Sequence, residues 1–159
     1  MQDSSIALSL QDINTYQKKT MKFIRRAGAT WHGTGKEGKG TMSTQSTALN
    51  NTQFSFGSRF EEGVGSSPEE LIGAALAGCF SMKLGFLVVA EGLVAESIET
   101  SAKVTNDGGL ITLIHLDVKA KVPGMSAENF AAAAKNAQDN CTITKSLNSE
   151  VTMNATLEA

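Results

Sequence analysis

A largely apolar stretch of 20 residues, 71–90, constrains the fold of this chain more than any other feature. Its length matches the hydrocarbon core of a bilayer. However, Lys83 stands near its middle, where a cation costs about 2.5–3.5 kcal/mol on membrane-insertion scales, and three glycines interrupt it. We therefore predict that this stretch is the buried core helix of a globular domain, with no membrane as partner.

The residues on either side of this stretch predict where the helix begins and ends. Ser67 can cap its amino terminus, Pro68 suits the first helical position, and Glu70 completes an S-x-x-E capping box. The helix is expected to reach Ala90 or Glu91 and to end at Gly92, a residue type that helices favour directly after their last turn.

The rest of the chain alternates between strand and turn patterns and contains a second helix. We expect strands at 23–32, 40–49, 97–105, 110–122 and 150–156, and a short extended piece at 54–60. Asn106-Asp107-Gly108-Gly109 is expected to form a hairpin turn between the strands at 97–105 and 110–122. A helix is expected to open at Ser126, and a short helical piece to follow Cys141. The prediction is an α+β fold, with antiparallel sheet packed on two helices. Residues 1–21 are predicted to be a polar, weakly helical extension, and residues 22–159 a single domain.

Charge and cysteine content exclude several classes of protein. Fourteen Lys and Arg against sixteen Asp and Glu leave a net charge of −2, so we expect no nucleic-acid partner. The two cysteines lie 62 residues apart, which excludes a CxxC motif and a disulfide framework. The first twenty residues lack the basic start of a secretory signal. We therefore expect a reducing, cytoplasmic location.

Taken by themselves, the candidate reactive residues allow more than one interpretation. Cys79 and Cys141 could be small buried residues or reactive thiols. With His32 and His115 they could in principle form a Cys₂His₂ zinc site, but no pair has the usual ligand spacing. We expect both histidines to be ordinary strand residues, and we predict no metal and no cofactor.

Several motifs together resemble the osmotically inducible (OsmC) family, part of the wider OsmC/Ohr group of organic hydroperoxide resistance proteins. The similarity covers about residues 22–157. Its most specific part is the combination of a P-E-E-L-I-G-A-A run, a C-F-S-M run and a distant second cysteine. The matching segments are Ala29-Thr30-Trp31-x-Gly33, Gly38-Lys39-Gly40-Thr41-x-Ser43-Thr44, Arg59-Phe60-Glu61, 67–75, 78–82, Val122-Pro123-Gly124 and Cys141.

This resemblance implies a fold, an activity and a set of site residues. The family folds as intertwined homodimers with antiparallel sheets around central helices. Its members include thiol peroxidases that reduce organic hydroperoxides, protect against oxidative or osmotic stress and are recharged by dithiols on lipoylated proteins. The positions that match the family's functional residues are Cys79, Cys141, Arg59 and Glu69. The resemblance thus implies a sulfenic acid on Cys79 and a disulfide between Cys79 and Cys141.

The chemistry of a thiol peroxidase requires a cation near its reactive cysteine. A thiol reacts as thiolate, and an unperturbed cysteine is mostly protonated at neutral pH. Cys79 lies well inside its helix, so the helix dipole contributes little. Lys83, four residues on, is one candidate. Arg59 is the better one, because a planar guanidinium can bind the thiolate on one edge while Glu69 holds the other. By themselves, Glu69 could simply compensate the helix dipole and Arg59 could be a solvated charge.

Helix geometry then predicts a composite site. Glu69 and Cys79 are ten residues apart on one helix, about 15 Å at 1.5 Å per residue, so they cannot share a site within one chain. Two such helices, antiparallel about a two-fold axis near Ala74, would bring Glu69 of one chain to Cys79 of the other. The small residues around Ala74 permit that approach.

Two other functions remain open alternatives to the peroxidase. One is a non-catalytic, stress-related ligand-binding dimer of the same fold. The other is a cysteine hydrolase, which is disfavoured because neither histidine stands in a recognisable base context. Apolar residues near Cys79, such as Leu76, Phe80 and Phe86, favour fatty or aryl hydroperoxides over hydrogen peroxide.

Overall fold

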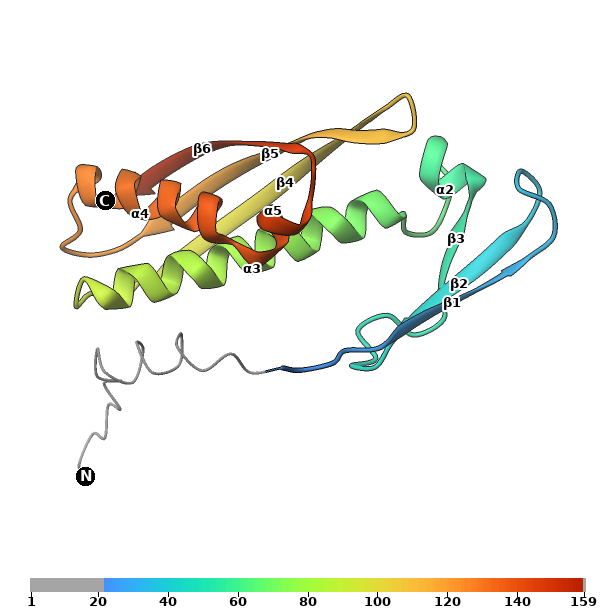
Figure 1. Ribbon diagram of the computed structural model, residues 1–159, viewed down its shortest axis with the longest axis horizontal. Helices are drawn as coiled ribbons and strands as arrows, with labels where there is room; N and C mark the ends of the chain where they lie inside the picture. Colours follow the sequence, from blue (N-terminus) through green and yellow to red (C-terminus); the bar gives the residue numbers. More distant parts are fainter. Residues whose placement is uncertain (1–21, 159) are drawn as a thin grey trace.

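The computed structural model describes residues 22–158, so the extension predicted at 1–21 lies outside the described residues. The described chain forms two three-stranded sheets and four helices, with the long helix α3 running from one sheet to beneath the other (Figure 1). In chain order the elements are β1 (Ala27–His32), β2 (Lys39–Thr44), β3 (Thr52–Ser55), α2 (Phe56–Phe60), α3 (Pro68–Ala90), β4 (Ser97–Asp107), β5 (Leu110–Lys121), α4 (Ala127–Asn140), α5 (Thr142–Ser146) and β6 (Glu150–Glu158).

The first sheet, β1-β2-β3, is antiparallel, and its strands are shorter than the sequence predicts. Gly40 of β2 lies directly beneath the ring of Phe54, where an added Cβ would come within 2.5 Å of the ring. The extended piece predicted at 54–60 is wrong from Phe56 onward, because α2 begins there. Ser55 and Ser58 cap that helix reciprocally, each side chain accepting the other's backbone N–H.

Helix α3 begins and ends as predicted, with one difference in its cap. The Ser67 hydroxyl accepts the Glu70 N–H at 3.2 Å, and Gly92 takes a positive φ of 76° after the last turn. The reciprocal hydrogen bond of the capping box, in which the Ser67 N–H would donate to the Glu70 carboxylate, is not formed. Glu70 instead accepts a hydrogen bond from the Ser66 hydroxyl at 3.1 Å. By length and composition α3 could cross a bilayer.

The second sheet corrects the prediction of a wholly antiparallel architecture. Strands β4 and β5 form the expected hairpin, joined by Gly108 and Gly109 with φ of 59° and 86°. Strand β6, however, pairs parallel to β5. The reason is the crossover through α4 and α5, which returns the chain to the end of the sheet where β5 begins, so that β6 runs in the same direction.

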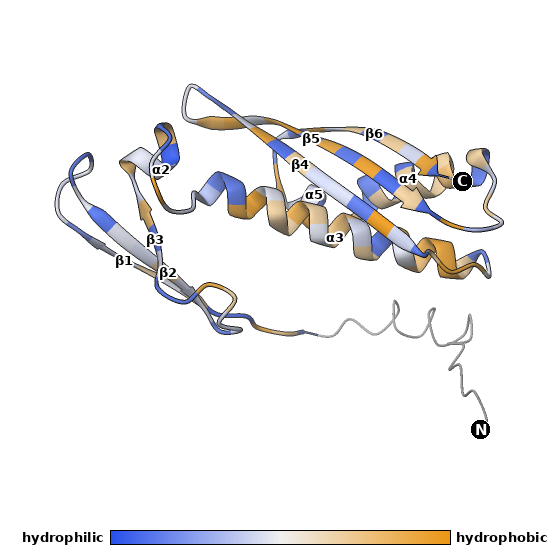
Figure 2. Ribbon diagram, turned by 180° about the vertical axis from the view of Figure 1, so that it is seen from behind, coloured by the Kyte–Doolittle hydropathy of each residue, from blue (hydrophilic) through white to orange (hydrophobic). Residues whose placement is uncertain are grey.

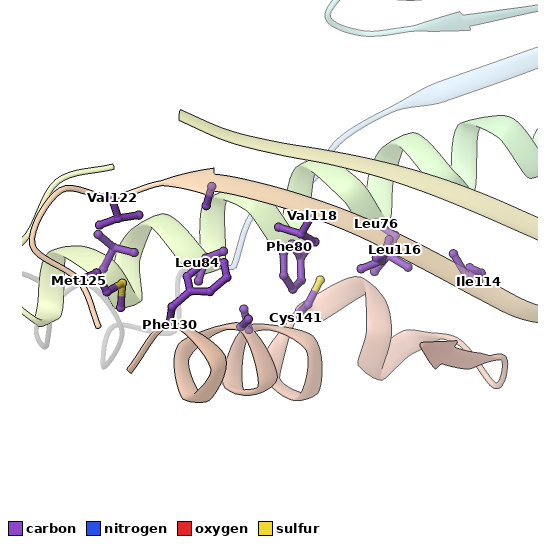
Figure 3. Close-up of a cluster of buried hydrophobic side chains, with 14 residues drawn as sticks. Leu76, Phe80, Leu84, Ile114, Leu116, Val118, Val122, Met125, Phe130 and Cys141 are labelled. Carbon is purple, nitrogen blue, oxygen red and sulfur yellow. The ribbon is translucent and has the colours of Figure 1, made fainter. Parts of the chain in front are cut away.

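The core lies between one face of the second sheet and two helices, with α3 packed on β4 and α4 on α3 and β6. Residues alternate between hydrophilic and hydrophobic along β4 and β5, while α3 is mostly hydrophobic (Figure 2). The close-up in Figure 3 shows Phe80, Leu84 and Phe130 at the centre of this layer. The fully buried large side chains are Leu76, Phe80, Leu84, Val88, Ile114, Leu116, Val118 and Cys141.

The chain leaves strand β1 and one side of helix α3 exposed. All six residues of β1 are exposed, and the first sheet lies beyond the amino-terminal end of α3 in both views (Figures 1 and 2). Helix α3 buries Gly73, Leu76 and Phe80 against the sheet, whereas Ala74, Ala75, Gly78 and Met82 face outward. This exposed side of α3 has small residues at helical spacing.

Candidate active site

Arg59 and Glu69 form a two-pronged ion pair between α2 and the first turn of α3. The Arg59 Nε donates to both carboxylate oxygens, at 2.9 and 3.2 Å, and Nη2 donates to Oε1 at 2.6 Å. The Arg59 side chain is 40% exposed and that of Glu69 15%. The hydrogen bond from Arg59 is the main reason why the pKa of the Glu69 carboxyl lies below its usual value. The contact expected between Arg59 and Glu69 is thus present within one chain, and its catalytic role stays a prediction.

An open pocket of about 540 Å³ surrounds this pair. The Phe60 ring lies under the guanidinium, 5.0 Å from Cζ, which is a cation–π arrangement. Asn106 of β4 donates its amide to Glu69 Oε1 at 3.1 Å. Polar and apolar residues share the wall: Arg59, Phe60, Ser67, Glu69, Glu70, Gly73, Ala102, Val104 and Asn106.

Sequence reasoning missed Asn106, which it assigned to a hairpin turn. The residue belongs to β4 instead, where Ala102 and Val104 face α3. Because side chains alternate along a strand, Asn106 falls on that same face. The alternation of β4, extended to its end, is the signal that could have found it.

The two cysteines lie together at the junction of α3, α4 and α5. Cys141 ends α4 and caps α5, is 1% exposed, and directs its side chain into the core beside Phe80 (Figure 3). Cys79, partly buried on α3, lies close enough to Cys141 for the second thiol to influence its pKa. Both thiols are free. The two cysteines that the sequence places 62 residues apart are thus direct neighbours.

Within one chain, the surroundings of Cys79 do not acidify its thiol. Burial is the largest effect and raises the pKa of Cys79, and the neighbouring Cys141 raises it further. The backbone N–H groups of Ile143 and Thr142 act in the opposite direction but do not outweigh burial. Neither Arg59 nor Lys83 is among the groups that shift this pKa.

The structure therefore brings the four predicted residues together as two separate pairs. Arg59 and Glu69 meet at the start of α3, and Cys79 and Cys141 meet further along it. The ten residues from Glu69 to Cys79 correspond to about 15 Å of helix. A guanidinium at the first position cannot reach a thiolate at the second within this chain.

The histidines lie apart from the cysteines. His32 ends β1 on an exposed strand, and the ring of His115 on β5 bonds Thr152 and Asn154 of β6. Within residues 22–158, no group of three His, Cys, Asp or Glu side chains could hold a metal ion.

Comparison with known proteins assigns the chain to a family. Residues 61–156 match the family model described as OsmC-like protein. The chain is 39% identical over 143 residues to proteins named peroxiredoxin OsmC from Escherichia coli (strain K12) and Shigella flexneri, covering 87% of this chain and 100% of each relative.

Solved structures give the same result at the level of the fold. An OsmC-like protein from Mycoplasma pneumoniae superimposes with a TM-score of 0.69 at 13% identity, covering 87% of this chain and 100% of the other. The organic hydroperoxide resistance protein OhrB of Bacillus subtilis superimposes with a TM-score of 0.57 at 18% identity, covering 84% of this chain and 98% of the other. With its family model, its curated relatives and its fold in agreement, this chain belongs to the OsmC-like protein family.

Proposed function

We propose that this protein is a cysteine-based peroxidase that reduces organic hydroperoxides to alcohols. The observation that carries the proposal is the proximity of two free thiols, Cys79 in the middle of α3 and Cys141 at the end of α4. The names of the relatives, peroxiredoxin OsmC and organic hydroperoxide resistance protein, support the same activity.

The proposed reaction uses each thiol once per turnover. The Cys79 thiolate attacks the distal oxygen of the hydroperoxide, the O–O bond breaks, and Cys79 becomes a sulfenic acid while the alkoxide takes a proton and leaves as alcohol. The Cys141 thiol then attacks the sulfenic sulfur, forming a disulfide and releasing water. An external dithiol reduces the disulfide by exchange and is itself oxidised to a disulfide. The family resemblance favours lipoylated proteins as that dithiol.

We further propose that the active site is composite and that the protein works as an intertwined homodimer. The pKa of Cys79 is raised by its own chain. Its own Arg59 is bound to Glu69, which lies about 15 Å along α3 from Cys79. A guanidinium beside Cys79 therefore has to come from another copy. The small exposed residues of α3, Ala74 and Gly78, would allow a second helix to approach closely. An antiparallel partner there would place its Arg59 and Glu69 near Cys79.

A complementation experiment tests this composite site. Two variants, Arg59→Ala, which is expected to be slow at neutral pH, and Cys79→Ser, which is expected to be inactive, are refolded together at neutral pH, and hydroperoxide consumption is followed with a dithiol present. If each site combines Arg59 of one chain with Cys79 of the other, a mixed dimer contains one intact site and activity returns. Each variant refolded alone is the control. If the mixture stays as inactive as its components although mixed dimers form, the site lies within single chains.

The activity itself is tested with an aryl hydroperoxide, a fatty hydroperoxide and hydrogen peroxide. Apolar Phe60, Ala102 and Val104 in the pocket wall favour the organic substrates. Catalytic consumption of the organic hydroperoxides supports the proposal. Binding without consumption would identify the protein as a ligand-binding dimer instead. We place the cycle in the cytoplasm, where free thiols persist, in the response to oxidative or osmotic stress.

A further inference from the structure

Asn106 is a polar residue of the pocket, and its side chain connects strand β4 to helix α3 by a hydrogen bond. It stands one residue before the end of β4, and its Nδ2 donates to Glu69 Oε1 at 3.1 Å, across 37 residues of sequence. This hydrogen bond connects the second sheet to the first turn of α3 and, through Glu69, to Arg59 on α2.

A β-bulge lies at the position of this residue. Thr105 pairs with Leu113, but Asn106 pairs with Ile111, so Thr112 is left as an extra residue on β5. Such a bulge increases local twist and re-aims side chains, and bulges are frequent beside active sites. Here the bulge turns the Ile111 side chain toward the core, against which it packs. The bulge lies at the end of the hairpin where Asn106 contributes to the pocket.

Glu69 Oε1 accepts three hydrogen bonds, and together they fix the carboxylate. Two come from Arg59 Nε and Nη2, at 2.9 and 2.6 Å, and the third from Asn106. The guanidinium therefore has its Nε–Nη2 edge on Glu69 and one face on the Phe60 ring. Among the described residues, its Nη1 has no hydrogen-bond partner, so that edge remains for a reacting group.

Of these three donors, only Asn106 is fixed by a sheet. Arg59 belongs to a five-residue helix and its side chain is 40% exposed, so its own surroundings hold it less firmly. Strand β4 packs on α3 and thus gives Asn106 a rigid base.

We propose that Asn106 is a positioning residue of the active site: it holds the Glu69 carboxylate so that Arg59 keeps its Nη1 edge directed at the reacting oxygen or thiolate. This inference rests on the proposed function, because Arg59 needs that direction only if it serves a reaction. Asn106 acts through Glu69 and Arg59 and does not itself touch the substrate.

The test compares three variants. Asn106→Ala removes the donor. Asn106→Asp replaces the donor with a carboxylate beside Glu69, and it regains a donor only when the pair of acids binds a proton. Asn154→Ala is the matched control, since Asn154 also donates to a carboxylate, that of Asp117 at 3.3 Å, on the outer face of the same sheet.

We expect Asn106→Ala to lose about tenfold in kcat/KM for an organic hydroperoxide, the change expected when one hydrogen bond to a charged group is lost. Asn106→Asp should lose more at pH 8, and its rate relative to the unmodified protein should recover towards about pH 5.5, as the acid pair takes up a proton. Asn154→Ala should keep full activity. A merely structural role would not produce this pH-dependent recovery.

A second readout is independent of activity. The titration of the Glu69 carboxyl, followed by NMR of carbon-13-labelled glutamate, should move to higher pH in Asn106→Ala and stay unchanged in Asn154→Ala. If both variants leave that titration and the rates unchanged, Asn106 does not position the pair. If the unmodified protein reduces no hydroperoxide, the proposed function fails, and the shift of the Glu69 titration still decides whether Asn106 holds the carboxylate.

Discussion

Arg59 binds Glu69 through one edge of its guanidinium, with Nη2 2.6 Å from Oε1 and Nε 2.9 Å from the same oxygen. A planar group held by one edge presents its other edge in a fixed direction. Lysine offers no such second edge, because its ammonium is a single point of charge on a flexible stem. The predictions for Arg59 and Glu69 follow from this relationship.

Replacing Arg59 by Ala should slow hydroperoxide reduction at neutral pH by raising the pKa of the Cys79 thiol in the dimer. Part of the rate should return at alkaline pH, as the thiolate forms unaided, while the loss of alkoxide stabilisation should remain. Arg59→Lys should recover the rate only in part. The measurement is the pH dependence of thiol alkylation, read beside the rate of hydroperoxide consumption.

The alkylation experiment needs a variant without the second thiol, so that only Cys79 reacts. Cys141→Ser provides that background, with and without Arg59→Ala. An alkylation midpoint that does not move when Arg59 is removed would mean that Arg59 does not acidify the thiol, and Lys83 or backbone N–H groups would have to do so.

Replacing Glu69 by Gln should lower the free energy of unfolding only where the carboxylate is charged. The pKa of Glu69 is lowered in the folded state, chiefly by the hydrogen bond from Arg59. The ion pair therefore stabilises fully above the unfolded value of about 4.3, and this stabilisation disappears as the pH falls through the lower folded value. Because the Arg59 side chain is 40% exposed, we expect the ion pair to contribute at most about 1 kcal/mol to the free energy of unfolding.

Urea unfolding of Glu69→Gln and the unmodified protein between about pH 8 and pH 3 checks this prediction. Glu99→Gln is the control, on an exposed position of β4. The difference in the free energy of unfolding between the unmodified protein and Glu69→Gln should be constant down to about pH 5 and should become smaller below that pH. A difference that persists unchanged at pH 3 would contradict the assignment to the ion pair.

Replacing Cys141 by Ser should allow one rapid oxidation and then stop turnover. Without the second thiol, the Cys79 sulfenic acid has no partner for a disulfide and is oxidised further to sulfinic acid. Stopped-flow measurement of hydroperoxide consumption should therefore give a burst of about one equivalent. Sustained turnover of this variant with a dithiol would show that Cys141 is not the resolving thiol.

Replacing Phe80 by Ala should destabilise the fold by about 3–5 kcal/mol, because it empties the centre of the core next to Cys79. Leu110→Ala, on a residue that is 70% exposed, should change the free energy of unfolding by less than about 0.5 kcal/mol. Denaturant titration measures both. A Phe80→Ala cost below about 1 kcal/mol would show that the core does not depend on this ring.

Local signals explain which elements the sequence predicts correctly. Helix α3 begins after Ser67 and ends before Gly92, since its capping residues and apolar run act within a few residues of one another. The β4–β5 hairpin is equally local, because two consecutive glycines accept the positive φ of a two-residue turn.

The errors arise where a longer-range or competing interaction decides the structure. Strand β6 pairs parallel to β5 because of the path of two helices, which no local pattern encodes. At 54–60, the alternating phenylalanines favour a strand, but the reciprocal Ser55–Ser58 cap begins a helix instead. Ser66 takes the Glu70 side chain away from the predicted capping box.

The candidate site divides in the same way. Arg59 with Glu69, and Cys79 with Cys141, could be predicted as pairs from the family resemblance together with the chemistry of thiolates and guanidinium groups. Asn106 could not, because its role depends on the tertiary contact between β4 and the start of α3.

The central claim, that Cys79 and Cys141 form a disulfide when a hydroperoxide is reduced, is tested most directly by intact mass. The reduced protein is mixed with an aryl hydroperoxide in the absence of any reductant and its mass is recorded. We predict a loss of about 2 Da, from the removal of two thiol hydrogens, with no change in Cys79→Ser and a gain of about 16 Da or more in Cys141→Ser. An unchanged mass in the unmodified protein, or a stable gain of oxygen without loss of hydrogen, would contradict the account.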